Sequence, residues 1–267
     1  MKWLKKIFKR SKVIPVVRLS GVIGSAGQFG GGGLTDENLK QVLEKAFETP
    51  KIKAVALLIN SPGGSPTQSS LIAARIQRLA LEKNVKVFAF CEDVAASGGY
   101  WLACSADEIF ADENSIIGSI GVISAGFGFH EFINRQGIER RVYTAGEDKS
   151  ILDPFRPEKT EDIEKLKNIQ IAIHQNFIKY VELRRGKKIK KDEVCTGEFW
   201  SAEKSAGLGL IDGIGHLEPV MKERYGESIE FKLISRRKPL FARLSRSMIN
   251  SLFGAVISKL YFSRFNL

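Results

Sequence analysis

Two unbroken apolar runs, each followed by a glycine-containing turn and a helix-like segment, constrain the fold more than any other feature of the chain. The first run, Lys53–Asn60, leads through Ser-Pro-Gly-Gly into a helical pattern over Thr67–Lys83. The second, Val85–Phe90, leads through Val-Ala-Ala-Ser-Gly-Gly into a helical pattern over Tyr100–Ala106. Continuous apolar runs are typical of strands that are buried on both faces of a parallel sheet. The sequence therefore predicts an α/β fold of repeated strand-turn-helix units.

The turns after these two strands are expected to converge. Parallel neighbours joined by right-handed crossovers present their carboxyl ends at the same edge of a sheet. Ser97 falls in the second turn, where we expect its own amide among the unpaired donors of a helix start. A Gly63 or Gly64 amide together with the Gly98 amide would then form an oxyanion hole beside the Ser97 hydroxyl. Two structural alternatives stay open, with Ser97 as a helix N-cap and Pro-Gly-Gly as an ordinary turn.

Hydrophobic and capping patterns elsewhere in the chain predict further strands and helices of the same α/β fold. A β-branched run predicts a first strand at Val13–Ser20, and the glycine-rich residues 21–33 predict a loop. Thr35 is placed to cap a helix over Asp36–Glu48. Further patterns predict strands at Asp107–Ala111, Ile116–Ser124 and Arg140–Thr144, and helices at His130–Gln136 and Glu158–Arg184.

The net charge of +11 resides at the two ends of the chain. Residues 1–12 hold six Lys/Arg, residues 231–267 hold eight, and neither segment has an acidic residue, which leaves a formal charge of −3 for the body between them. A nucleic-acid-binding domain carries its basic surface on the folded body, so we expect no nucleic-acid partner. The chain is divided into a basic amphipathic segment 1–12, a folded domain 13–230 and a basic amphipathic extension 231–267.

Both ends combine an apolar face with a cationic one. Trp3, Leu4, Ile7 and Phe8 recur at helical spacing, and the extension has apolar residues at four-residue steps from Leu240 to Leu260. Such segments bind the surface of anionic membranes. Docking on the body or on a second subunit is an equal alternative for the extension.

Neither end matches a segment that inserts into or crosses a membrane. No run approaches the roughly 20 apolar residues that span a bilayer, and residues 1–12 lack the continuous apolar core of a signal peptide. We expect a cytoplasmic protein with peripheral contact to the cytoplasmic face of a membrane.

The three cysteines, Cys91, Cys104 and Cys195, lie in apolar or mixed sequence surroundings and form no Cys-x-x-Cys pair. An odd number without metal-ligand spacing predicts buried, reduced thiols in a reducing compartment. The sequence predicts no metal site and no cofactor.

Six short motifs follow one another along the chain. They are Asn60-Ser-Pro-Gly-Gly, Ala96-Ser-Gly-Gly-Tyr-Trp, Gly118-Ser-Ile-Gly-Val, Ala145-Gly-x-x-Lys-Ser, Asp153-Pro-Phe and Gly207-Leu-Gly-Leu-Ile-Asp-x-x-Gly. In this order they resemble the signal peptide peptidase A (protease IV) family of serine peptidases, over roughly residues 13–225. The resemblance implies a Clp-protease/crotonase-like fold for the domain 13–230 and a hydrolase that cleaves peptide bonds.

The resemblance also implies a Ser-Lys dyad, with Ser97 as nucleophile and Lys149 as general base. A serine hydroxyl needs a neighbouring base, and a lysine can serve only when its amine is neutral, which burial beside apolar groups favours. Glu147 and Asp148 adjoin Lys149 and are expected to face solvent. Of the three histidines only His130 stays open as an alternative base, because His174 and His216 are expected to be structural or exposed.

Relatives in this family are single-copy chains that assemble as rings, or double-length chains with two repeats. In the double-length forms the nucleophile and the base come from different repeats. The resemblance therefore implies a homo-oligomer in which Lys149 comes from a neighbouring subunit, and peptide substrates such as signal-peptide remnants or other membrane-associated hydrophobic peptides. Two other functions stay open: a non-catalytic, membrane-associated scaffold on the same fold, and acyl-CoA hydratase or isomerase chemistry, in which carboxylates transfer the proton.

Overall fold

The structure, a computed structural model, describes residues 12–24, 33–146, 149–235, 259 and 261–265. Most of both predicted basic ends, most of the loop 21–33, and Glu147 and Asp148 therefore lie outside the described residues. The chain divides into two compact units, one formed by Met1–Ile120 with Ile178–Leu267 and the other by Gly121–Phe177. Ser97 belongs to the first unit and Lys149 to the second.

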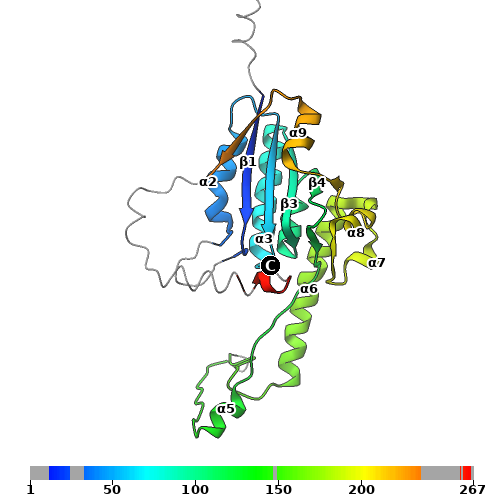
Figure 1. Ribbon diagram of the computed structural model, residues 1–267. Helices are drawn as coiled ribbons and strands as arrows, with labels where there is room; N and C mark the ends of the chain where they lie inside the picture. Colours follow the sequence, from blue (N-terminus) through cyan, green and yellow to red (C-terminus); the bar gives the residue numbers. More distant parts are fainter. Residues whose placement is uncertain (1–11, 25–32, 147–148, 236–258, 260, 266–267) are drawn as a thin grey trace, which may run out of the picture. The chain divides into compact units, whose positions relative to one another are not determined.

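A single sheet organises the first unit (Figure 1). Within the described residues its main path runs in the order β6-β5-β3-β2-β1-β8, with β4 beside β3 and β7 beside β4. Every pairing is parallel except the antiparallel pair β5–β6. The strands are β1 (Val13–Ser20), β2 (Ala54–Ser61), β3 (Lys86–Ala96), β4 (Glu108–Ala111), β5 (Ile116–Gly118), β6 (Phe199–Ser201), β7 (Gly213–Ile214) and β8 (Glu230–Ile234).

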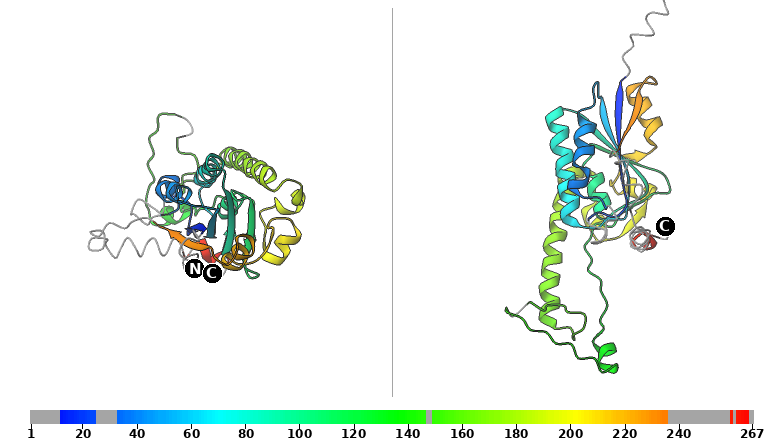
Figure 2. Two further views of the ribbon diagram at one scale, coloured as in Figure 1. Left: turned by 90° about the horizontal axis from the view of Figure 1, so that it is seen from above. Right: turned by 90° about the vertical axis from the view of Figure 1, so that its left-hand side faces the viewer.

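Helices cover both faces of this sheet. Figure 2 shows α2 and α3 along one face and α9 on the other. The helices are α2 (Asp36–Phe47), α3 (Pro66–Lys83), α4 (Gly98–Ala103), α5 (His130–Arg135), α6 (Thr160–Arg185), a 3-10 turn (Gly186–Lys188), α7 (Lys191–Val194), α8 (Ala202–Gly207) and α9 (Leu217–Tyr225).

Local sequence explains where the two long crossover helices begin. The Thr35 hydroxyl accepts the Asn38 amide at the start of α2, and the Ser65 hydroxyl accepts the Gln68 amide at the start of α3. Pro66 follows in the first turn of α3, where its missing N–H leaves no helical bond unmade. The capping of α2 by Thr35 confirms the prediction.

Strand β2 is buried on both faces, which explains why polar and apolar residues do not alternate in the first apolar run. Leu57 and Ile59 of β2 are fully buried, and so is Ala56, whose side chain points to the other face. On that second face Ala56 packs in one cluster with Phe88 of β3 and Met221 of α9. The strand is therefore covered on both sides, as the apolar run predicts.

Several predicted boundaries differ from the structure. The second apolar run continues as β3 to Ala96, because its last residues pair with β5. The predicted strand Ile116–Ser124 ends at Gly118, since φ is +117° at Gly118 and +53° at Ser119. Helix α4 ends at Ala103, short of the predicted Ala106.

The predicted strand Arg140–Thr144 is wrong. Its residues have no regular secondary structure and no strand partner among the described residues. The side chains of Arg140 and Arg141 instead bind the carboxylates of Asp153 and Glu139. Without a neighbouring strand the extended backbone has no ladder of hydrogen bonds to stabilise it.

Candidate active site

Ser97 forms the turn between β3 and α4. Its carbonyl accepts the Trp101 amide at 3.0 Å, the first hydrogen bond of the helix, but its side chain makes no capping hydrogen bond. The backbone has φ +53° and ψ −121°, whereas an N-cap residue is normally extended. Such strain costs on the order of 1–3 kcal/mol and is concentrated at functional sites. The N-cap alternative therefore does not account for the Ser97 hydroxyl.

The backbone amide of Ser97 is not one of the free donors. It donates to the Gly118 carbonyl at 2.8 Å, so the expectation that this amide is unpaired is wrong. Gly118 reaches this position because β5 pairs with β3 through Ala96 and Gly118. This hydrogen bond fixes the serine turn to the end of β5. In the sequence, only the motif that begins at Gly118 indicated that this segment belongs to the site.

Gly63 lies directly against the serine turn, so the two predicted turns do converge. A Cβ added at Gly63 would lie 2.8 Å from the Ser97 Cβ, 2.9 Å from the Gly98 nitrogen and 3.0 Å from the Ala96 oxygen. Real Cβ atoms do not approach other atoms so closely, and φ is +103° at Gly63. Glycine is therefore required here both for its backbone conformation and for space. The Pro-Gly-Gly turn is thus packed directly against the serine turn, as expected if the two turns form one site.

The three predicted oxyanion donors differ in their hydrogen bonding. The Gly63 amide donates to the Ser61 hydroxyl at 3.2 Å. Within the described residues, the amides of Gly64 and Gly98 donate to no protein group. Gly64 forms a parallel β-bridge with Ile23. In this bridge the Ile23 amide donates to the Gly63 carbonyl and the Ser65 amide donates to the Ile23 carbonyl, so the Gly64 amide takes no part. Among the described residues the Gly98 amide, next to Ser97, and the Gly64 amide, next to Gly63, thus have no partner, and such amides can bind a developing oxyanion.

Lys149 belongs to the second unit and is exposed. Its backbone amide donates to the Gly146 carbonyl at 3.4 Å, while its side chain has no ion pair or hydrogen bond with any described residue. The neighbouring Ser150 accepts a hydrogen bond from Arg156 at 3.0 Å. In the single chain Lys149 therefore lacks the apolar burial that favours a neutral amine.

The second unit exposes many large apolar side chains. Phe127 is 80% exposed, Phe132 61% and Tyr143 91%. Ile169 and Ile171 of α6 are 59% and 54% exposed. Exposed apolar residues gathered in one small unit are typical of a surface that contacts another protein.

The histidines are placed differently from one another. His130 opens α5 in the second unit. His216 Nε2 lies 2.8 Å from Asp112 Oδ2 at the start of α9. The hydrogen bonds that Asp112 accepts from the Asn114 amide, His216 and the Asn114 side chain lower the pKa of its carboxyl to about 2.

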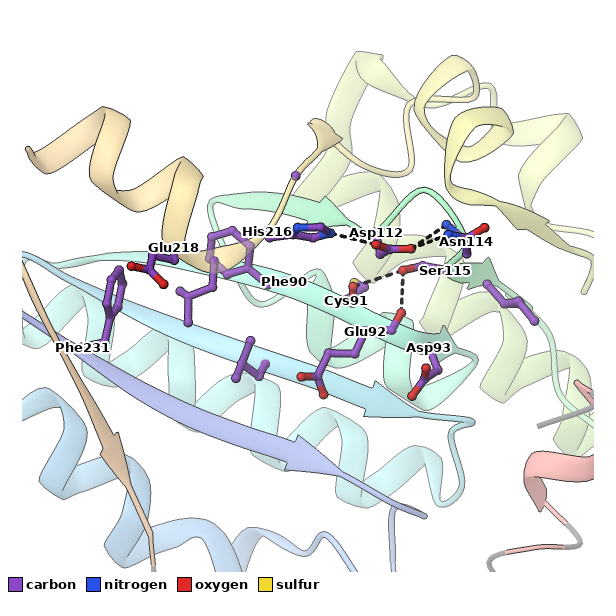
Figure 3. A pocket seen from close by; sticks show the side chains of 14 residues that line it. Phe90, Cys91, Glu92, Asp93, Asp112, Asn114, Ser115, His216, Glu218 and Phe231 are labelled. Carbon is purple, nitrogen blue, oxygen red and sulfur yellow. Dashed lines mark hydrogen bonds and ion pairs between the residues drawn. The ribbon is translucent and has the colours of Figure 1, made fainter. Parts of the chain in front are cut away.

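A cavity of the first unit lies away from Ser97. It has a volume of about 690 Å³, and its lining includes Phe90, Asp112, His216 and Phe231 but none of the predicted site residues (Figure 3).

Among the described residues, no cluster of three or more side chains could hold a metal ion, and no helix is both long and apolar enough to span a bilayer.

Comparisons with known proteins agree with the motif pattern. The model of peptidase family S49 matches residues 80–227. The chain is 32% identical over 224 residues to the chloroplastic serine protease SPPA of Arabidopsis thaliana, covering 81% of this chain and 32% of that protein. It is 50% identical over 231 residues to a protein named Na(+)/H(+) antiporter NhaA of Brucella abortus, covering 86% of this chain and 31% of that protein. The chain thus spans about a third of the length of these two relatives.

A solved structure supports the fold alone. The 1510-N membrane-bound stomatin-specific protease, in complex with a substrate peptide, superimposes with a TM-score of 0.54 at 14% sequence identity. The match covers 92% of this chain and 98% of that one. The predicted Clp-protease/crotonase-like fold is confirmed.

Proposed function

The chain belongs to peptidase family S49, and we propose that it is a serine peptidase with a Ser-Lys dyad formed by Ser97 and Lys149. The observation that carries this proposal is the conformation of Ser97. The residue is held at positive φ, its hydroxyl caps nothing, the next amide, that of Gly98, has no partner among the described residues, and Gly63 packs directly against the turn. Neither a helix cap nor a packing role requires that combination.

The proposed reaction follows the usual two steps of covalent catalysis. The neutral amine of Lys149 takes the proton of the Ser97 hydroxyl as the oxygen attacks the carbonyl carbon of the peptide bond. The Gly64 and Gly98 amides hold the resulting oxyanion. The amine leaving group departs with the proton from Lys149, leaving an ester on Ser97. A water, deprotonated by Lys149, then hydrolyses this ester and releases the free serine.

The exposed position of Lys149 supports a homo-oligomer in which the dyad is completed between subunits. A neutral lysine needs apolar burial, and the single chain leaves this side chain in solvent. The exposed apolar residues of the second unit, among them Phe127 and Tyr143, provide a surface for a neighbouring subunit. Assembly would then bury Lys149 and bring it to Ser97 of the next chain.

The proposed substrates are hydrophobic peptides such as signal-peptide remnants, cleaved at the cytoplasmic face of a membrane. The motif pattern supports this substrate class, and the basic, amphipathic ends support peripheral membrane contact. A fluorophosphonate probe, which reacts with activated serines, tests the central proposal. We expect labelling of the wild type and none of Ser97→Ala. Absence of labelling in every assembly state would favour the scaffold alternative, or acyl-CoA chemistry, in which Ser97 has no role.

A further inference from the structure

Lys149 begins a compact loop, residues 149–156, in the connection between α5 and α6 (Figure 1). The residue that follows it, Ser150, is held at two points of this lysine loop. The Ser150 carbonyl accepts the Asp153 amide at 3.3 Å, and its hydroxyl accepts Nη1 of Arg156 at 3.0 Å. The Arg156 amide in turn donates to the Asp153 carbonyl at 3.1 Å. The backbone that carries the proposed base is therefore fixed by the residues just after it.

The Asp153 side chain connects this loop to the preceding part of the second unit. Its Oδ1 accepts the Phe155 amide at 3.0 Å, and its Oδ2 accepts Nε of Arg140 at 3.2 Å. Only 9% of the Asp153 side chain is exposed, whereas both side chains of the pair Glu139–Arg141 in the same unit are 69% exposed. An ion pair in full contact with water contributes little. Charge-assisted hydrogen bonds on both oxygens of a shielded carboxylate, in contrast, hold it in one position.

Phe155 attaches the loop at a second place. Its ring stacks on that of Phe129, with the centroids 5.6 Å apart, and the guanidinium carbon of Arg140 lies 5.6 Å from the Phe155 centroid. The Phe129 amide also donates to the Pro154 carbonyl at 2.6 Å. Arg140 therefore contacts both the carboxylate of Asp153 and the ring of Phe155.

Leu152, next to Asp153, has a backbone conformation that leucine disfavours. Its φ is +54°, a region in which the β-carbon crowds the backbone. Such a conformation persists only where the surrounding structure restrains it, and it is concentrated at functional sites. The hydrogen bonds of Asp153 supply this restraint, so without them the loop can relax and move Lys149.

We propose that Asp153 is a positioning residue for Lys149, a role that rests on the proposed Ser-Lys dyad. Asp153 fixes the lysine loop so that the amine of Lys149 reaches the Ser97 hydroxyl in one geometry. It acts through Lys149 and makes no contact of its own with the reacting atoms. Placement of a catalytic group is worth a large factor in rate, since a misplacement of about 1 Å costs about a hundredfold.

Steady-state kinetics with a peptide substrate test this role. Asp153→Ala loses both acceptors and should lower kcat about a hundredfold, with KM unchanged because only the placement of the base differs. Asp153→Asn keeps an acceptor for the Phe155 amide and should lose about tenfold. The matched control is Glu139→Gln, which breaks the exposed ion pair with Arg141 in the same unit and should keep the wild-type kcat.

A double variant assigns the loss to the lysine. With the fluorophosphonate probe, adding Asp153→Ala to Lys149→Ala should slow labelling no further, because the group that Asp153 positions is already absent. Circular dichroism shows whether each variant is folded. If Asp153→Ala is unfolded, Asp153→Asn serves for the same comparison.

The possible failures of the two proposals differ. A folded Asp153 variant with the wild-type kcat, beside an inactive Lys149→Ala, would overturn the positioning role alone. A further loss in the Lys149→Ala background, or a raised KM, would also overturn it, since Asp153 would then act on something other than the lysine. Labelling of Lys149→Ala at the wild-type rate would instead refute the dyad and, with it, this inference.

Discussion

Gly63 lies so close to Ser97 that there is no room for a side chain at position 63. A methyl group at position 63 would lie 2.8 Å from the Ser97 Cβ and 2.9 Å from the nitrogen of Gly98. We therefore expect Gly63→Ala to displace the Gly98 amide from the oxyanion site. Loss of one oxyanion donor costs about 10²–10³ in rate, so fluorophosphonate labelling should slow by about a hundredfold.

The matched control for this change is Gly207→Ala. A Cβ at Gly207 meets no atom within 4 Å, and its φ is not positive. This variant should react with the probe at the wild-type rate. If Gly63→Ala also reacted at that rate while remaining folded, the Gly98 amide would have no part in the chemistry.

Loss of either dyad member should abolish turnover of a peptide substrate. Ser97→Ala and Lys149→Ala remove groups that act in the same step, so the double variant should lose little beyond either single change. Lys149→Arg should be nearly as inactive as Lys149→Ala, because a guanidinium does not deprotonate. Steady-state kinetics of the four variants measure this. Independent, multiplicative losses would argue against a dyad.

The dependence of activity on pH separates the two candidate bases. With a lysine base the rate should rise along an alkaline limb, since only the neutral amine accepts the proton. A histidine base would instead give a limb that disappears in His130→Ala. An unchanged profile in Lys149→Ala would reject the lysine assignment.

Mixing of inactive subunits tests whether the dyad forms between chains. Ser97→Ala subunits retain Lys149, and Lys149→Ala subunits retain Ser97. Mixed oligomers should therefore recover part of the wild-type activity, whereas each variant alone stays inactive. The control is a mixture of Ser97→Ala with the double variant, which contains no intact pair. A fully active monomer in size-exclusion chromatography would show that one chain suffices.

Asp212 is expected to stabilise the fold through a buried arginine. Its carboxylate accepts hydrogen bonds from Arg185 at 2.7 Å and Lys188 at 2.6 Å, and the Arg185 side chain is 2% exposed. Asp212→Asn leaves a buried guanidinium without its counter-charge, which costs about 3–5 kcal/mol of unfolding free energy. Lys188→Ala, which removes a partner that is 57% exposed, should cost no more than about 1 kcal/mol. Urea denaturation measures both, and equal losses would contradict this ranking.

The same carboxylate gives stability a defined pH dependence. Burial raises the pKa of Asp212, but the hydrogen bonds from Arg185, Lys188 and the Ile109 amide outweigh this and lower it below 3.8. A carboxyl with a lower pKa in the folded state contributes its full stability above the unfolded-state pKa, near 4, and loses it as the pH falls through the folded-state pKa. The difference in unfolding free energy between wild type and Asp212→Asn should therefore shrink below about pH 4.

Membrane contact is expected to depend on the first twelve residues. Each Lys or Arg near an anionic leaflet contributes about 1 kcal/mol, and the attraction is screened by salt. Sedimentation with anionic vesicles should weaken as salt is added and should drop when residues 1–12 are deleted. Equal sedimentation with neutral and anionic vesicles, or none with either, would exclude this anchor.

The sequence by itself determined the buried strands, the helix starts and the two turns of the site. These features depend on local patterns: an unbroken apolar run needs cover on both faces, Thr35 caps the residues that follow it, and the glycines at 63 and 64 supply positive φ. The motif order then pointed to Ser97 and Lys149. Periodicity failed at Arg140–Thr144 because a strand exists only where another strand lies beside it.

Only the tertiary structure decided which amides near Ser97 are free. The Ser97 amide donates to Gly118 and the Gly63 amide to Ser61, so that of the predicted donors only the Gly64 and Gly98 amides have no partner among the described residues. Ser97 and Gly118 are 21 positions apart in the sequence and become neighbours only because β5 pairs with the end of β3. Hydrophobic pattern and turn chemistry act over a few residues, whereas the partner of an amide depends on which distant segment the fold brings within hydrogen-bonding distance.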